Sequence, residues 1–332
     1  MVNSIELLHY NELAERKYID NLAPVVIFAY NRVDHIIRTV ESLSKNKYAE
    51  NSTVIFFSDG YKEEKEGDKE KVEAVRKYIK DTEQLFGKVV VYERKKNYGL
   101  ANNIIDGVTA VVNRFGKIIV LEDDICTSPF FLQYMNDALE IYKDVTDVME
   151  IGGFMPIEIN SEVPEGVFLP WTTSWGWATW KRSWRFFERN PEKLINSLTP
   201  KEIYKINING TDKGQWNQVL RNQKKEIYTW AVFYSIAVIR NHGRVLYPNV
   251  SMCKNIGFDG SGANCGASSI NVFEKLANSC MALFPEKIEV DDDTVKQIMQ
   301  YNIKNNKIRR KELYRSLPKK IILKLLKDKG EN

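Results

Sequence analysis

Three adjacent carboxylates follow an apolar segment of the chain. Glu122, Asp123 and Asp124 come directly after the run at residues 118–121. Acidic side chains gathered beside a buried strand repel one another unless a positive group compensates them. Mg²⁺ and Mn²⁺ prefer oxygen ligands, and they typically take one or two carboxylates and complete their shell with substrate phosphates. The triplet therefore indicates a divalent-cation site, with a solvated turn before a helix as the alternative.

Polar residues also follow the three preceding apolar segments. Tyr30 and Arg32 follow the first, and the planar fork of Arg32 suits a diphosphate or, alternatively, a surface ion pair. Asp59 follows the second and is suited to accept the N–H of a uracil ring, with a plain turn as the alternative. Asn97 and Gly99 follow the third, where helix N–H groups suit an anion or a ribose, with an ordinary helix cap as the alternative.

The elements that must position these residues alternate along the first 150 positions. Short apolar runs predict strands, and apolar residues at helical spacing predict helices between them. The predicted strands are 24–30, 53–57, 88–92 and 117–121, and the predicted helices include 68–86 and 100–115. Such alternation favours a mostly parallel sheet with right-handed crossovers, in which ligands bind at the carboxyl ends of the strands. The polar clusters all fall at that edge.

Composition excludes several classes of protein. With 43% hydrophobic and 28% charged residues among 332, the chain has the composition of an ordinary globular protein rather than a disordered one. A net charge of +4 is too small to indicate nucleic-acid binding. Four cysteines without a Cys-x-x-Cys pair, and only three histidines, argue against a structural zinc site.

The ends of the chain bear on location. Residues 1–15 lack a signal-peptide core, and no apolar run approaches the roughly 18 residues of a membrane-spanning helix. We therefore expect a cytoplasmic protein with free thiols. Residues 304–329 are rich in basic side chains, and residues 317–326 are amphipathic. This tail is a candidate for peripheral contact with the inner face of a membrane, with a solvated end as the alternative.

The four polar clusters together resemble a known family. Residues 29–32, 58–60, 97–101 and 121–124 are similar, in that order, to the nucleotide-sugar half of GT-A glycosyltransferases. The likeness is greatest to family 2 enzymes and N-acetylglucosaminyltransferase I, and it continues to about residue 266. The resemblance implies an α/β nucleotide-diphospho-sugar transferase fold, with a Rossmann-like, mostly parallel sheet and helices on both faces.

The resemblance also implies roles for individual residues. Asp59 would contact the base, and Asp124 would hold Mn²⁺ or Mg²⁺ against the donor diphosphate. Glu122 and Asp123 would lie near the donor ribose and sugar. The implied reaction is an inverting transfer from a nucleotide sugar, with UDP favoured, to a saccharide or lipid-linked acceptor. The implied setting is the synthesis of a surface polysaccharide.

Two positions depart from the family pattern. Asn264 stands where a His is expected near the metal or diphosphate, and Ala231 stands where many relatives carry the acidic base. Inverting transfer needs a carboxylate that takes the acceptor proton. The remaining candidates are Asp259, which we rank first because it lies in a glycine-rich turn, followed by Asp212 and Glu226.

Tryptophans crowd residues 171–184. We expect Trp175 to lie near the substrate and the helically spaced Trp177, Trp180 and Trp184 to pack in the core. A non-catalytic carbohydrate- or nucleotide-binding module is the rival hypothesis from another class. A sugar nucleotidyltransferase is disfavoured, because residues 30–34 lack the glycine-rich loop that holds a nucleoside triphosphate.

The expected domain organisation has three parts. Residues 1–22 form an N-terminal extension, and residues 23–285 form the glycosyltransferase domain. Within it, 23–150 is the donor half and 151–285 the acceptor half. Residues 286–332 form a basic, helical C-terminal extension.

Overall fold

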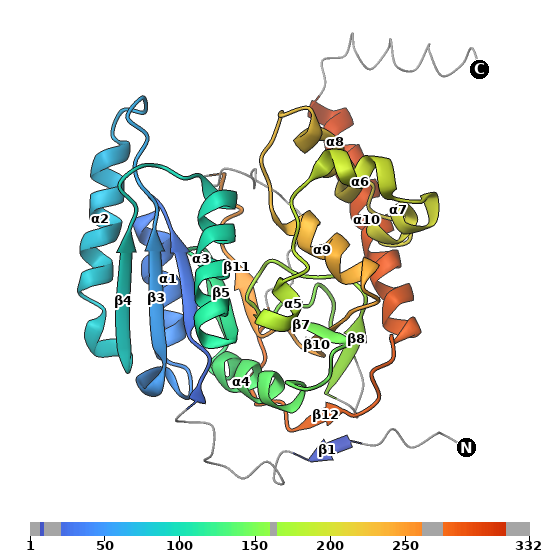
Figure 1. The fold of residues 1–332 in the computed structure, drawn as a ribbon, viewed down its shortest axis with the longest axis horizontal. Helices are drawn as coiled ribbons and strands as arrows, with labels where there is room; N and C mark the ends of the chain where they lie inside the picture. Colours follow the sequence, from blue (N-terminus) through green and yellow to red (C-terminus); the bar gives the residue numbers. More distant parts are fainter. Residues whose placement is uncertain (1–6, 10–20, 160–164, 261–274, 317–332) are drawn as a thin grey trace.

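The computed structural model describes residues 7–9, 21–159, 165–260 and 275–316 (Figure 1). Asn264, Cys265 and the amphipathic tail segment 317–326 lie outside the described residues. The strands are β1 Leu7–His9, β2 Val25–Ala29, β3 Thr53–Ser58, β4 Lys88–Glu93, β5 Lys117–Glu122, β6 Ile125–Thr127, β7 Val148–Gly152, β8 Gly166–Leu169, β9 Trp177–Trp180, β10 Arg244–Pro248, β11 Cys253–Asn255 and β12 Leu283–Pro285. The helices are α1 Val33–Ser44, α2 Asp68–Lys80, α3 Leu100–Phe115, α4 Phe131–Ile141, α5 Lys181–Trp184, α6 Pro191–Ser197, α7 Pro200–Ile206, α8 Gly214–Gln223, α9 Ala231–Arg240 and α10 Asp292–Ser316, with 3₁₀ turns η3 Ala49–Asn51 and η4 Glu83–Leu85.

Eight strands form one continuous sheet in the order β4-β3-β2-β5-β9-β7-β10-β8. The first four are parallel to one another, and β7 is parallel to β10. β9 runs antiparallel to both of its neighbours, β5 and β7. The predicted α/β class with a mostly parallel sheet is confirmed.

Alternate residues of the strands supply two apolar cores, one on each face of the sheet. Val25 and Ile27 of β2 face the core that includes α1, α2 and α4, whereas Val26 and Phe28 face the core that includes α3, α5 and α9. All five residues of β2 are buried. This explains why its sequence is continuously apolar, because a parallel strand covered by helices on both faces has no solvated side.

The helix predictions differ in accuracy. The structure confirms α3 over residues 100–115, and Gly116 ends it in the left-handed region at φ 79°. The prediction for residues 68–86 was too long, because α2 ends at Lys80. The hydroxyl of Thr82 donates to the carbonyl of Ile79 at 2.7 Å, and a short 3₁₀ turn follows. This local bond competes with continuation of the helix.

The tryptophan cluster is buried, but it does not share one helix. Trp177 and Trp180 lie on β9 and Trp184 on α5, and all three are at most 5% exposed. The predicted burial of these three tryptophans in the core is therefore confirmed. Their predicted helical spacing was wrong, because two of them lie on a strand. Trp177 stacks on Trp230 with ring centroids 5.3 Å apart, which packs α9 onto the sheet.

Helices α6 to α10 gather on one side of the molecule, away from α1 and α2 (Figure 1). Val295 and Ile298 attach α10 to the α3-side core. No helix in the described ranges is long and apolar enough to cross a membrane. Of the described cysteines, Cys126, Cys253 and Cys280 are free thiols.

Candidate active site

The order of the parallel strands reverses between β2 and β5. Chain connections lead from β2 outward to β3 and β4, and the next strand, β5, pairs with the other side of β2. Ligands in open α/β sheets bind outside the carboxyl ends of the strands at such a switch point. A cavity of about 650 Å³ opens there, lined by the ends of β2, β3 and β5 and by residues from α8 and α9.

The predicted nucleotide-sugar residues come together in this cavity. The lining includes Tyr30, Arg32, Asp59, Asn97, Gly99, Glu122, Asp123, Asp124 and Trp175. Each was predicted from its place after a strand or in the tryptophan cluster, and the parallel register of the sheet brings them to one edge.

Asp59 joins the end of β3 to the start of α3. Its Oδ1 accepts the backbone N–H groups of Gly60 and Tyr98 at 2.9 and 2.8 Å, and its Oδ2 accepts that of Gly99 at 3.0 Å. Burial raises the pKa of Asp59, and these three N–H groups oppose that shift. The side chain of Asn97 donates to the carbonyl of Gly60 at 2.7 Å, so the two loops are held together from both sides.

A second carboxylate holds the loop after β2. Asp68, the first residue of α2, is fully buried. It accepts hydrogen bonds from the Tyr30 hydroxyl, from the Asn31 amide at 2.6 Å and from the backbone N–H of Lys62 at 2.8 Å. Tyr30 therefore has its hydroxyl directed at the protein, and the face of its ring remains as the part that can contact a ligand.

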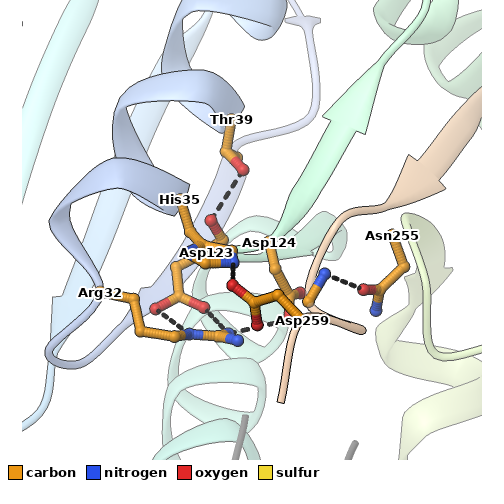
Figure 2. A network of polar contacts seen from close by, with 8 residues as sticks. Arg32, His35, Thr39, Asp123, Asp124, Asn255 and Asp259 are labelled. Atoms are coloured by element: carbon orange, nitrogen blue, oxygen red, sulfur yellow. Dashed lines mark hydrogen bonds and ion pairs between the residues drawn. The ribbon is translucent and has the colours of Figure 1, made fainter. Parts of the chain in front are cut away.

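Arg32 lies between the last two acids of the triplet (Figure 2). Its Nη2 donates to Asp123 Oδ1 and, at 2.8 Å, to Asp124 Oδ2. Its Nε is 3.5 Å from Asp123 Oδ2. The side chains of Asp123 and Asp124 are only 6% and 8% exposed, so this ion pair is largely shielded from water.

One arginine does not neutralise three acids. Burial first, and then the charges of Asp124 and Asp123, raise the pKa of Glu122 to about 8, although Arg32 lowers it. Burial also raises the pKa of Asp123, against the opposing effect of Arg32. The negative charges of Asp123 and Asp124 therefore still act on Glu122 in the presence of Arg32.

The residues present fit a divalent cation bound at Asp124. Asp124 Oδ1 is buried and has no hydrogen-bond partner, which leaves a hard oxygen ligand free. Within the described residues, no group of three or more His, Cys, Asp or Glu side chains could hold a metal ion. A cation at Asp124 therefore needs further oxygens from outside the protein, as Mg²⁺ and Mn²⁺ often take from substrate phosphates.

The segment after β11 covers the triplet. β11 pairs antiparallel with β6, which directly follows Asp124, so residues 255–259 pass over the acids. The backbone N–H of Ile256 donates to the carbonyl of Asp124 at 2.9 Å. A β-carbon at Gly257 would lie 2.2 Å from Asp124 Oδ2 and 3.1 Å from Arg32 Nη1, so this close approach requires glycine.

Asp259, the first-ranked base, lies at the edge of the same network (Figure 2). Its Oδ2 is 3.2 Å from Nε2 of His35 on α1, and its side chain is half exposed. Asp259 does not belong to the described lining of the cavity. The structure therefore brings Asp259 close to the acidic triplet, but beside the cavity rather than in its wall.

The other two base candidates lie elsewhere. Asp212 accepts the backbone N–H of Gly214 at 3.0 Å and the side-chain amide of Gln215 at 3.0 Å, as expected at the start of α8. Glu226 pairs with Arg221 at 3.2 Å. Neither carboxylate lines the cavity as described, although Arg221 and Gln215 do.

The side of the cavity formed by residues 171–175 and 227–235 is aromatic and neutral for the most part. Trp175 contacts Phe154 and Phe258 edge-on, with centroids 4.5 and 5.4 Å apart. Tyr228 is 53% exposed, and the guanidinium of Arg189 lies 3.3 Å from its ring centroid. Ala231, at the start of α9, also lines this side. Exposed ring faces of this kind suit the apolar faces of a sugar.

Sequence reasoning missed several residues of the site. Lys62 and Lys65 line the cavity, Asp68 holds the lining residue Tyr30, and His35 lies beside Asp259 at the edge of the acidic network. His35 carries a usable signal, because it lies one helical turn after Arg32 on a helix that begins at the switch point. Asp68 could have been found as the first residue of a helix that follows a left-handed glycine, Gly67 at φ 71°.

Comparisons with known proteins find one family model and a set of similar solved structures. Residues 25–157 match the family model described as glycosyl transferase family 2. No curated protein matches the chain. Similar solved structures include S. aureus TarS, at 12% identity over 70% of this chain and 36% of that chain, with a TM-score of 0.39. Another is the mannosyltransferase PcManGT from Pyrobaculum calidifontis, in complex with GDP-Man and Mn²⁺, at 11% identity over 70% of this chain and 74% of that chain, with a TM-score of 0.35.

The matched segment contains the switch point, the acidic triplet and the loops that carry Arg32, Asp59 and Asn97. Residues 25–157, which carry these motifs, are therefore similar to a family 2 glycosyl transferase domain.

Proposed function

We propose that the protein transfers a hexose or N-acetylhexosamine from a nucleotide-diphosphate donor, with UDP favoured, to a hydroxyl of a saccharide or lipid-linked acceptor. The observation that carries the proposal is the acidic triplet at the switch point. Its last member, Asp124, lines the cavity and has a buried carboxylate oxygen without a partner. The transfer inverts the anomeric centre and belongs to the assembly of a surface polysaccharide.

Asp124 holds Mn²⁺ or Mg²⁺ in this proposal. The bound cation supplies Lewis acidity to the departing phosphate. The free Oδ1 of Asp124 supports this role. Glu122 and Asp123 lie beside it and position the donor ribose and sugar.

Asp59 orients the nucleobase of the donor through the second acceptor direction of its Oδ2 atom. Its Oδ2 accepts an N–H from Gly99, and a carboxylate oxygen can accept two hydrogen bonds. The second direction is available to a ring N–H such as that of uracil. Arg32 contributes a planar fork to the diphosphate, and Trp175 contributes a ring to the sugar.

Asp259 takes the proton from the acceptor hydroxyl in this scheme. It is the candidate that adjoins the Asp124 network, whereas Asp212 and Glu226 bond to residues of α8 and the loop after it. His35 Nε2 lies 3.2 Å from the Asp259 carboxylate.

A nucleotide-sugar screen by thermal shift, with and without Mn²⁺, tests the proposal. A ligand that binds the folded state raises the melting temperature by mass action, so the donor is expected to stabilise the protein by several degrees with Mn²⁺ present. Asp124→Asn removes one negative charge with little change of shape. It is expected to abolish the Mn²⁺-dependent stabilisation and to lower turnover at least 100-fold. Unchanged turnover in this variant would remove the metal role from Asp124.

A non-catalytic binding module is the second candidate. It is favoured by one observation: among the described residues, none of the three base candidates lines the cavity. Donor binding without hydrolysis or transfer, across a panel of saccharide acceptors, would favour the module. Release of free UDP from a UDP-sugar in the presence of acceptor would favour the enzyme.

The basic tail serves as a peripheral anchor at the cytoplasmic face of the membrane in this proposal. Sedimentation with vesicles containing anionic lipid tests it, using the full chain and a chain that ends at Ser316. Loss of sedimentation on truncation is expected, since the removed segment carries the amphipathic lysine-rich stretch. Equal partitioning of the two chains would exclude the tail as the anchor.

A further inference from the structure

Arg32 supplies positive charge to the last two acids of the triplet. A single nitrogen, Nη2, donates to both Asp123 and Asp124, so one guanidinium bridges the two carboxylates. Arg32 reaches them from the end of β2, across the switch point from β5. The two acids therefore tolerate each other through a side chain of the protein itself.

This pairing leaves one donor and one acceptor unused. Nη1 of Arg32 and Oδ1 of Asp124 are both buried without a hydrogen-bond partner. The two unused groups have opposite requirements, because Nη1 needs an anionic or neutral acceptor and Oδ1 needs a cation or a donor. A diphosphate bound together with a divalent cation supplies both at once.

The two oxygens of Asp124 are unequal in this arrangement. Oδ2 is held by Arg32 at 2.8 Å, and the backbone of Gly257 closes over the pair. A divalent cation that binds Asp124 without a diphosphate would lie close to the guanidinium, and like charges at short range repel strongly in a shielded site. A diphosphate removes this conflict because it accepts Arg32 and contributes ligands to the cation.

We propose that Arg32 is an internal counter-ion that excludes divalent cations from the triplet until a nucleotide diphosphate arrives and draws the guanidinium away. The inference rests on the proposed function, and it adds the way in which metal and donor bind to the site. Metal and donor bind as one complex, and neither binds tightly alone. Arg32 acts as a positioning residue for the acids in the free protein and as a phosphate ligand in the loaded one.

Mn²⁺ binding provides a readout that does not depend on turnover. Electron paramagnetic resonance reports the free Mn²⁺ concentration, so the dissociation constant is measured with and without UDP. We expect wild-type protein to bind Mn²⁺ at least 10-fold more tightly with UDP than without it. Arg32→Gln is expected to bind Mn²⁺ alone at least fivefold more tightly than wild type, and to lose most of the gain that UDP gives.

Two further variants keep the test decisive. Arg32→Lys keeps the charge but cannot present a bridging fork, so it should fall between wild type and Arg32→Gln, and it serves if the glutamine variant does not fold. Arg38→Gln, at an exposed position on the same helix, is the matched control and should behave as wild type.

The outcomes separate the two proposals. If Arg32→Gln and Arg32→Lys bind Mn²⁺ alone no more tightly than wild type, while wild type still shows the UDP-dependent gain, the counter-ion inference is overturned and the proposed function stands. If wild type binds neither UDP nor GDP with Mn²⁺, the proposed function falls and the inference falls with it.

Discussion

Glu150 and Thr173 are joined by a hydrogen bond of 2.8 Å, in which the backbone N–H of Thr173 donates to Oε1 of the buried carboxyl group. The second oxygen, Oε2, is buried without a partner. Burial raises the pKa of Glu150 well above its ordinary value, against the effect of the hydrogen bond. This buried carboxyl group of β7 therefore positions a loop whose next residues, Ser174 and Trp175, line the cavity.

Glu150→Gln is expected to change the free energy of unfolding by less than about 1 kcal/mol, because a neutral amide keeps the acceptor and the volume. Glu150→Ala is expected to cost about 2–4 kcal/mol through the lost bond and the cavity left behind. Urea unfolding followed by far-ultraviolet circular dichroism measures both. A glutamine variant as unstable as the alanine variant would show that Glu150 is ionised in the folded protein.

Asp259 is expected to be the most sensitive of the three base candidates. Asp259→Asn should lower the turnover number at least 100-fold with a smaller change in donor affinity, since loss of a general base affects the chemical step. Asp212→Asn and Glu226→Gln should act mainly on stability, through α8 and its neighbouring loop. Asp293→Asn, at an exposed position on α10, is the matched control. Steady-state kinetics of the four variants would contradict the ranking if Asp212→Asn or Glu226→Gln were the most damaging.

Gly257→Ala tests the close approach of the β11 loop to the acidic triplet. The added carbon would meet Asp124 Oδ2 at 2.2 Å, so either the loop or the Arg32–Asp124 pair has to move. We expect at least a 10-fold loss of Mn²⁺–UDP affinity and a destabilisation of about 1–3 kcal/mol. Lys254→Ala, on the same strand, should leave both quantities near wild type. Isothermal titration of Mn²⁺–UDP into the two variants distinguishes them. Equal affinities of the two variants for Mn²⁺–UDP would show that the loop moves aside at little cost in free energy.

Asp137 predicts a pH dependence of stability. Its side chain is 2% exposed on α4, its Oδ2 has no partner, and burial raises its pKa from 3.8 to about 7, although Lys47 and Gln133 lower it. The folded protein therefore binds a proton at Asp137 that the unfolded chain releases. The contribution of Asp137 to the free energy of unfolding is greatest below pH 3.8 and falls as the pH rises towards about 7. From pH 5 to pH 8, wild type should lose about 2–3 kcal/mol relative to Asp137→Asn, which has no charge to bury. Urea unfolding of both proteins at the two pH values checks this, and a difference that does not change with pH would contradict it.

The donor half of the site was predictable because its geometry is local in the sequence. Asp59 and Asp124 each follow an apolar strand, and a parallel sheet brings the ends of such strands to one edge. The bridging contact of Arg32 was not predictable, because it depends on β5 pairing with β2 rather than with β4. The sequence pattern of an arginine after a strand is the same whether its guanidinium binds a phosphate or two carboxylates.

The acceptor half was less accessible to sequence reasoning. Asp259 meets His35 because β11 pairs with β6, two strands more than 120 residues apart. Asp212 looked like a catalytic acid but holds the first turn of α8, which is a common use of Asp at a helix start. Neither the position of Asp259 nor that of Asp212 produces a periodic pattern in the sequence. Only the folded structure therefore shows that Asp212 bonds to the start of α8 and that Asp259 lies beside the site.

The single sheet beneath the cavity restricts how its lining can rearrange. β9 bonds to β5 on one side and to β7 on the other, so the two walls share an unbroken backbone ladder. Rotating β5 and its neighbours against β7 and its neighbours would break the hydrogen bonds of β9. The segments that follow each strand can bend without breaking those bonds. The lining of the cavity can therefore change through those segments while the strands beneath them keep their register.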